Sequence, residues 1–92
     1  MAIDLDRAWR LHPSVAVRPE PFGALLYHFG NRKLSFLKSP AVVVLVQALA
    51  DHPTGRDACA AVGIGEGELP TYARALSTLA ASQMICERTP EA

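Results

Sequence analysis

The sequence has few cysteines and histidines, and those it has stand apart. Its 92 residues include two cysteines and three histidines. None of these has a neighbour at the spacing of a zinc site, where Cys or His pairs lie a few residues apart. Two free thiols and a single disulfide are both compatible with the two cysteines. We therefore expect no metal site.

An excess of charge of either sign is also missing. The chain has nine Lys and Arg and nine Asp and Glu residues, so its formal net charge is zero. Neutrality removes the phosphate attraction on which non-specific nucleic-acid binding depends. Residues 7–38 nevertheless contain six basic residues and one acidic residue, Glu20. This distribution is typical of ordinary solvated surface, or of a weakly basic face that suits an acidic partner.

No hydrophobic run is long enough to cross a bilayer. The longest, AVVVLV, starts at Ala41, whereas a spanning helix needs about 20 apolar residues. The N-terminal stretch MAIDLDRAWRLHP contains no apolar core of signal-peptide length. We expect a soluble cytoplasmic protein with a single domain over residues 1–92, in which residues 1–12 and 88–92 are less ordered.

Groups that could perform catalysis are not found in suitable settings. Cys59 lies among alanines and Cys86 follows Ile85, whereas a reactive cysteine needs an electropositive, partly exposed site. Glu66 and Glu68 are more typical of charges at a helix start than of an acid–base pair. The sequence therefore predicts a protein that is not an enzyme and holds no cofactor.

The first half of the chain has mainly strand character. Residues 4–11 are predicted to form a short helix, but the stretches 15–18, 22–29 and 32–37 alternate in the manner of strands. Gly30-Asn31 separates the last two, and both residues tolerate a positive φ. The pattern predicts a β-hairpin with its turn at these two residues.

The second half has helical character. Ser39 followed by Pro40 is typical of a helix start, with serine as the N-cap and proline at the first helical position. The valines that follow would also suit a strand, but the Ser-Pro start favours a helix. Thr54 is placed to cap a second helix, which Gly63 would end. We expect helices over residues 41–50, 54–63 and 68–82 and a short extended piece over residues 83–87.

The predicted fold class is α+β, with a small three-stranded antiparallel sheet followed by three helices in a layout similar to a winged helix-turn-helix. That layout suggests a DNA-binding transcriptional regulator. A DNA-reading third helix should carry several basic or amide side chains, but this one offers Arg74 before Gln83. The open edge of the hairpin could instead accept a peptide as an added strand. DNA binding remains the alternative function, and an interaction domain without a peptide ligand is a third.

Two stretches carry a family resemblance. VAVRPEPFGALLYH from Val15 and LSFLKSP from Leu34 closely resemble the peptide chaperone family of mycofactocin biosynthesis. This family belongs to the wider group of precursor-peptide recognition domains typified by the pyrroloquinoline-quinone chaperone. The resemblance covers nearly the whole chain, from Trp9 to residues 76–85. It implies a three-stranded sheet packed on three helices. It also implies two partners, the leader of a ribosomally made precursor peptide and a radical S-adenosylmethionine maturase that carries its own iron–sulfur clusters.

The resemblance further implies where the leader would bind: along the third strand, in a groove beside the third helix. The expected function is a non-enzymatic chaperone that takes up the leader by strand addition and presents it to the maturase. Core packing is at least as well supported as peptide contact for four apolar residues of this region: Leu34, Phe36, Leu76 and Leu79. The candidate peptide-binding residues are Arg32, Lys33, Leu34, Ser35, Phe36, Leu37, Tyr72, Ala73, Leu76, Leu79 and Ala80.

Overall fold

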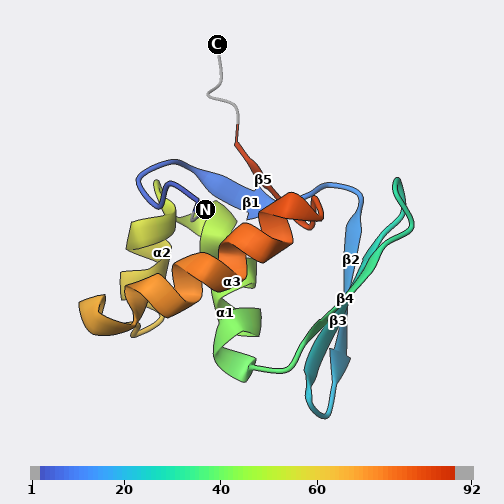
Figure 1. Ribbon diagram of the computed structural model, residues 1–92, viewed down its shortest axis with the longest axis horizontal. Coiled ribbons are helices and arrows are strands. Elements are labelled where there is room, and N and C mark those ends of the chain that lie inside the picture. Colours follow the sequence, from blue (N-terminus) through green and yellow to red (C-terminus); the bar gives the residue numbers. More distant parts are fainter. Residues whose placement is uncertain (1–2, 89–92) are drawn as a thin grey trace.

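The computed structural model describes residues 3–88, in which a three-stranded sheet stands beside three α-helices and a separate two-stranded sheet joins the two ends of this region (Figure 1). The mixed α+β fold class is confirmed. The less ordered ends expected at residues 1–12 and 88–92 fall partly outside the described residues. In chain order the elements are β1 (Trp9–Leu11), β2 (Val15–Glu20), β3 (Gly23–His28), β4 (Leu34–Leu37), α1 (Pro40–Ala48), the 3-10 turn η1 (Leu49–Asp51), α2 (Gly55–Ala61), the 3-10 turn η2 (Glu66–Glu68), α3 (Leu69–Ala81) and β5 (Ile85–Glu87).

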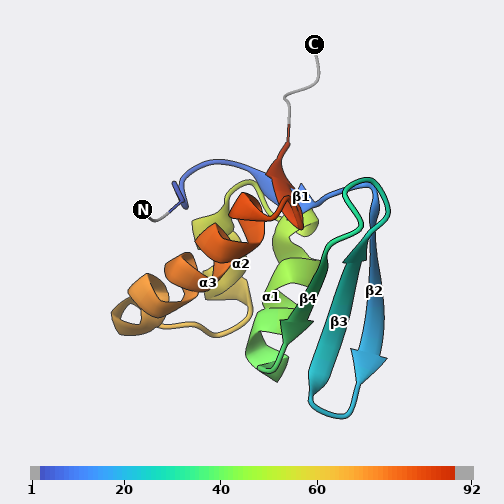
Figure 2. The ribbon, with the colours of Figure 1, turned by 45° about the vertical axis from the view of Figure 1, so that its right-hand side comes forward.

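The three-stranded sheet contains the predicted hairpin. Its strand order is β2-β3-β4 with antiparallel neighbours, so β2 and β4 are its edges (Figure 2). Leu26 at the centre of β3 lies opposite Val17 of β2 and Ser35 of β4. Pro19 lies in the edge strand β2, where its missing N–H is tolerated.

The hairpin turn lies where it was predicted but has a different geometry. The left-handed residue is Arg32, with a φ of 61°, and neither Gly30 nor Asn31 has a positive φ. The backbone N–H of Arg32 donates to the carbonyl oxygen of His28 at 2.8 Å. The chain therefore makes one helical turn after β3, and the left-handed residue that returns it to β4 comes at the end of that turn.

The predicted helix starts are confirmed by their caps. The side chain of Ser39 accepts a hydrogen bond from the Val42 N–H at 3.4 Å at the start of α1. The hydroxyl of Thr54 accepts one from the Asp57 N–H at 3.0 Å at the start of α2. Gly63, which follows α2, has a φ of 88°, a backbone conformation that glycine adopts without steric cost.

The predicted helix over residues 4–11 is wrong. Trp9–Leu11 is a strand, β1, and it pairs antiparallel with β5, with Trp9 opposite Glu87 and Leu11 opposite Ile85. The extended piece expected near residues 83–87 is confirmed as β5. The backbone groups of β1 are satisfied by a segment more than 70 residues away, and such long-range pairing overrides a weak local helix preference.

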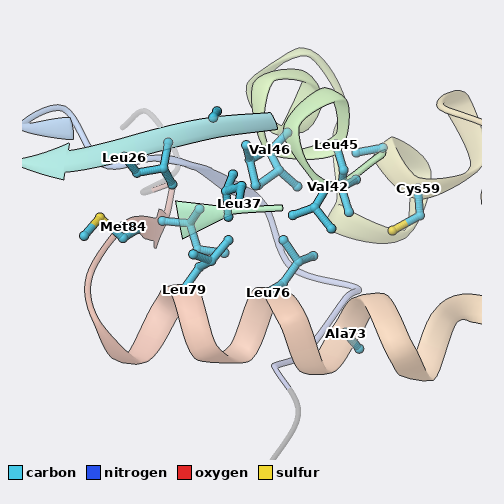
Figure 3. Close-up of a cluster of buried hydrophobic side chains, with 14 of the residues drawn as sticks. Leu26, Leu37, Val42, Leu45, Val46, Cys59, Ala73, Leu76, Leu79 and Met84 are labelled. Carbon is cyan, nitrogen blue, oxygen red and sulfur yellow. The ribbon is translucent and has the colours of Figure 1, made fainter. Parts of the chain in front are cut away.

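The core lies between the sheet, α1 and α3. The inner face of the sheet contributes Ala24 and Leu26, which are fully buried, and the ring of His28. The opposite side chains of β3, Leu25 and Tyr27, point away from the core because successive residues of a strand alternate between its faces. Figure 3 shows the converging core side chains, among them Leu26, Leu37, Val42, Leu45, Val46, Leu76, Leu79 and Met84.

Candidate peptide-binding site

A groove of about 370 Å³ lies between β4 and α3. Its buried lining includes Leu37, Val42 and Leu79, which also belong to the core. Phe36 and Lys38 are exposed at its rim. An apolar floor with a few polar or charged groups around it is typical of a site that accepts part of another molecule. The full lining is Ser35, Phe36, Leu37, Lys38, Ser39, Val42, Ala75, Thr78 and Leu79.

The open edge of β4 borders this groove. Among the described residues, β4 has a single neighbour in its sheet, β3. The N–H of His28 donates to the carbonyl oxygen of Lys33 at 3.0 Å, and hydrogen-bonded pairs alternate along an antiparallel ladder. We therefore expect Ser35 and Leu37 to bond to β3, while the N–H and C=O groups of Leu34 and Phe36 point to the open edge. These are the groups that an added strand would use.

The loop between β3 and β4 is attached to the end of α3. The buried ring of His28 accepts hydrogen bonds at Nδ1 from the N–H groups of Gly30 (3.0 Å) and Asn31 (3.1 Å). The side-chain amide of Asn31 donates to the carbonyl oxygen of Ser82 at 3.2 Å. The ring of His12 packs against that of His28, with 4.4 Å between ring centroids. These contacts hold one end of the strand wall of the groove against its helix wall.

The other end of β4 is held by a close backbone approach. Gly23 opens β3 with a φ of 146°, and a Cβ at this position would collide with the carbonyl oxygen of Leu37. Glycine is therefore required for the last residue of β4 to lie against the start of β3. Ser39 then turns the chain into α1, whose Val42 enters the groove. The strand wall is thus fixed at both of its ends.

The structure brings together some of the predicted site residues and separates the others. Ser35, Phe36, Leu37 and Leu79 line the groove. The remaining seven do not. Arg32 and Lys33 are exposed before β4, Leu34 is exposed on β4, Tyr72 and Ala80 are half-buried against the core, and Ala73 and Leu76 are buried within it.

The structure shows which of the large apolar residues belong to the core, the alternative to peptide contact that the sequence left open. Leu34 and Phe36 are more than half exposed, so core packing is wrong for both. Leu76 is fully buried in the core. Leu79 is buried in the core and also lines the groove.

Sequence reasoning missed part of the lining. On α3 the groove is formed by Ala75, Thr78 and Leu79, which have the i, i+3, i+4 spacing of one helix face. The residues that connect β4 to α1 were missed as well. Helical spacing shows which residues share a face, but it does not show which face lies beside a strand. The missed lining residues are Lys38, Ser39, Val42, Ala75 and Thr78.

The possible metal ligands of residues 3–88 do not cluster, and the buried cysteine is not activated. Residues 3–88 contain no cluster of three or more His, Cys, Asp or Glu side chains that could hold a metal ion. Both cysteines are free thiols. Burial raises the pKa of the Cys59 thiol, although Arg56 opposes this, and a protonated thiol is a poor nucleophile. Across the same residues no helix is both long and apolar enough to cross a membrane.

Comparison with known proteins decides the family. The model of the peptide chaperone MftB family matches residues 8–86. The chain belongs to this family. The peptide chaperone MftB of Mycobacterium ulcerans is 61% identical over 84 residues, which cover 91% of this chain and 77% of that protein. The protein of the same name from Mycobacterium tuberculosis is 59% identical over 92% of this chain and 78% of its own length. That of Mycolicibacterium smegmatis is 54% identical over 99% of this chain and 89% of its own.

Membership of the MftB family confirms the resemblance seen in the two sequence stretches and gives the chain a peptide chaperone role in the mycofactocin system. No solved structure matches the chain. The groove between β4 and α3 is the candidate site for the peptide.

Proposed function

We propose that this MftB-family chaperone binds the leader of a ribosomally made mycofactocin-type precursor as an additional strand on the open edge of β4, in the groove beside α3. It then presents the precursor to a radical S-adenosylmethionine maturase. The observation that supports this most strongly is the juxtaposition of an unpaired strand edge with an apolar groove in a member of a peptide chaperone family. Main-chain bonds to the edge would supply affinity, and the groove would supply specificity.

The groove limits which leaders fit. A strand added at the edge of β4 alternates its side chains between the two faces of the sheet. Every second side chain would therefore point toward Leu37, Val42 and Leu79, which are buried and apolar. The intervening side chains would remain on the solvent side. We expect the bound part of the leader to be an extended segment with apolar residues at every second position.

Charge at the ends of β4 favours an acidic leader. Arg32 and Lys33 precede the strand and Lys38 follows it, and all three are exposed. None forms a salt bridge with a carboxylate within residues 3–88. Unpaired surface cations raise the association rate of an acidic ligand more than they raise its affinity.

The chain itself is proposed to be non-catalytic and to need no cofactor, so the redox chemistry belongs to the maturase. Purified protein mixed with the precursor and S-adenosylmethionine should leave the mass of the precursor unchanged. A mass shift without the maturase would contradict this part of the proposal.

The location of the leader is tested by amide hydrogen exchange with and without the peptide. Added leader should slow exchange along Leu34–Leu37 and along α3 more than along Val15–Glu20, the opposite edge of the same sheet. A leader of scrambled sequence at the same concentration is the control. Protection confined to α2 (Gly55–Ala61) or to the glycine-containing segment after it would place the peptide elsewhere.

A DNA-binding role has less support. Arg74 is the single basic residue of α3, the helix that would enter the major groove. Titration of the protein with duplex DNA at physiological salt, beside the leader titration, separates the two functions. Tight DNA binding without leader binding would favour the regulator.

A further inference from the structure

The face of the three-stranded sheet that points away from the core carries a continuous apolar surface. The pairs Leu25 with Phe36 and Tyr27 with Leu34 lie directly opposite each other on β3 and β4, so their side chains share this face. Phe22 packs beside Phe36 with 6.1 Å between ring centroids. The ring of Phe29 packs edge-on against that of Tyr27, with 4.9 Å between ring centroids. We call this surface the outer face; it comprises Phe22, Leu25, Tyr27, Phe29, Leu34 and Phe36.

Folding does not account for the outer face. Phe22, Phe29, Leu34 and Phe36 are 41%, 62%, 53% and 61% exposed. Among the described residues they are four of the five large hydrophobic side chains that are exposed, and the fifth, Val44, lies on α1. Single exposed apolar residues are normal, but a contiguous patch of a few hundred Å² marks an interaction surface. Within residues 3–88 the outer face therefore lacks a partner.

A second copy of this chain is a poor partner for it. Both ends of β4 are basic, with Arg32 and Lys33 at one end and Lys38 at the other. Two outer faces placed together in either orientation would bring like charges close, which costs binding energy.

We propose that the outer face is the docking surface for the modifying enzyme, which would present an apolar patch bordered by carboxylates. The inference rests on the proposed function, because it needs an enzyme partner for the peptide-bound chaperone. The leader would use the edge of β4 and the groove beside α3, so the outer face stays open while the leader is bound. Phe36 alone belongs to both surfaces. The chaperone can then hold peptide and enzyme at the same time.

The test separates the two surfaces with a double variant, Phe22→Ser with Phe29→Ser. Neither residue lines the groove, and both are exposed, so the fold should be retained. The matched control is Val44→Ser, because Val44 is 52% exposed on α1 and away from the outer face. Binding of each labelled protein to the purified radical S-adenosylmethionine maturase and to the leader peptide is measured by fluorescence anisotropy. The oligomeric state is measured by sedimentation.

The double variant should bind the maturase about ten-fold or more weakly than the parent, as expected for the loss of buried aromatic anchors. Its affinity for the leader should stay within about two-fold of the parent, and the control should bind both as the parent does. Unchanged binding of the double variant to the maturase would overturn the proposal. So would a parent dimer that the double variant converts to a monomer. Failure of the parent to bind the leader would instead refute the proposed function, so the two failures are distinguishable.

Discussion

Replacing Phe36 by proline tests strand addition at the level of a single backbone group. Because the N–H of Phe36 is expected to point to the open edge, proline removes a donor that the leader would use and leaves the bonds between β3 and β4 in place. The residue before it, Ser35, is already extended, as a residue before proline must be. Phe36→Ala is the matched control, since it removes the same side chain and keeps the N–H.

The expected effect follows from the net contribution of one hydrogen bond. That contribution is about 0.5–1.5 kcal/mol, which corresponds to roughly a two- to twelve-fold change in the dissociation constant. Contact between the proline ring and the incoming strand would add to this loss. Phe36→Ala should weaken binding through lost apolar contact alone, so the difference between the two variants reports the backbone donor.

The assay is calorimetric titration of each variant with the leader peptide, after circular dichroism has confirmed folding. Ser35→Pro is a second comparison, because the N–H of Ser35 is expected to bond to β3 and its loss should destabilise the hairpin itself. Equal leader affinity for Phe36→Pro and Phe36→Ala, with both folded, would refute the strand-addition reasoning.

Three further outcomes follow from the structure. The double variant Arg32→Glu, Lys33→Glu should bind an acidic leader more weakly than the parent, since exposed pairs contribute about 0.2–1 kcal/mol each. The difference in affinity between variant and parent should be larger at low salt than at high salt. Equal affinities of variant and parent at every salt concentration would contradict the electrostatic part of the proposal. His28→Leu deprives two loop amides of their acceptor and should lower the free energy of unfolding by about 1–3 kcal/mol in urea melts, so an unchanged midpoint would show that the ring is dispensable. Cys59 is fully buried, and burial raises the pKa of its thiol. It should therefore react with a disulfide reagent more slowly than the half-buried Cys86, and equal rates would argue against its burial.

Local chemistry predicted much of the fold. Ser39-Pro40 and Thr54 start helices because a side-chain oxygen and a fixed φ act within one turn of chain. The alternation in residues 22–29 and 32–37 predicted the hairpin, because side chains of a strand alternate strictly between its faces. Such signals involve residues a few positions apart, and they can be found without knowledge of the rest of the chain.

The candidate site could be predicted only in part. The family resemblance directed attention to the third strand and the third helix, and four of the predicted residues do line the groove. The helix face was assigned less well, because Ala73 and Leu76 point into the core while Ala75 and Thr78 border the groove. A rotation of about 100° separates successive residues of a helix, so the lining depends on how α3 is turned against the sheet.

The sequence by itself determined the class of fold, the hairpin, the capped helices and the family to which the chain belongs. Tertiary structure decided that residues 9–11 are a strand, because their partner is β5 at the far end of the chain. It also decided that Leu34 and Phe36 face solvent while Leu37 faces the core, because the alternation of a strand states which residues share a face but not which face the helices cover. The groove and the outer face both result from that second choice. Within residues 3–88, α1 and α3 pack on one side of the sheet and leave the other side uncovered.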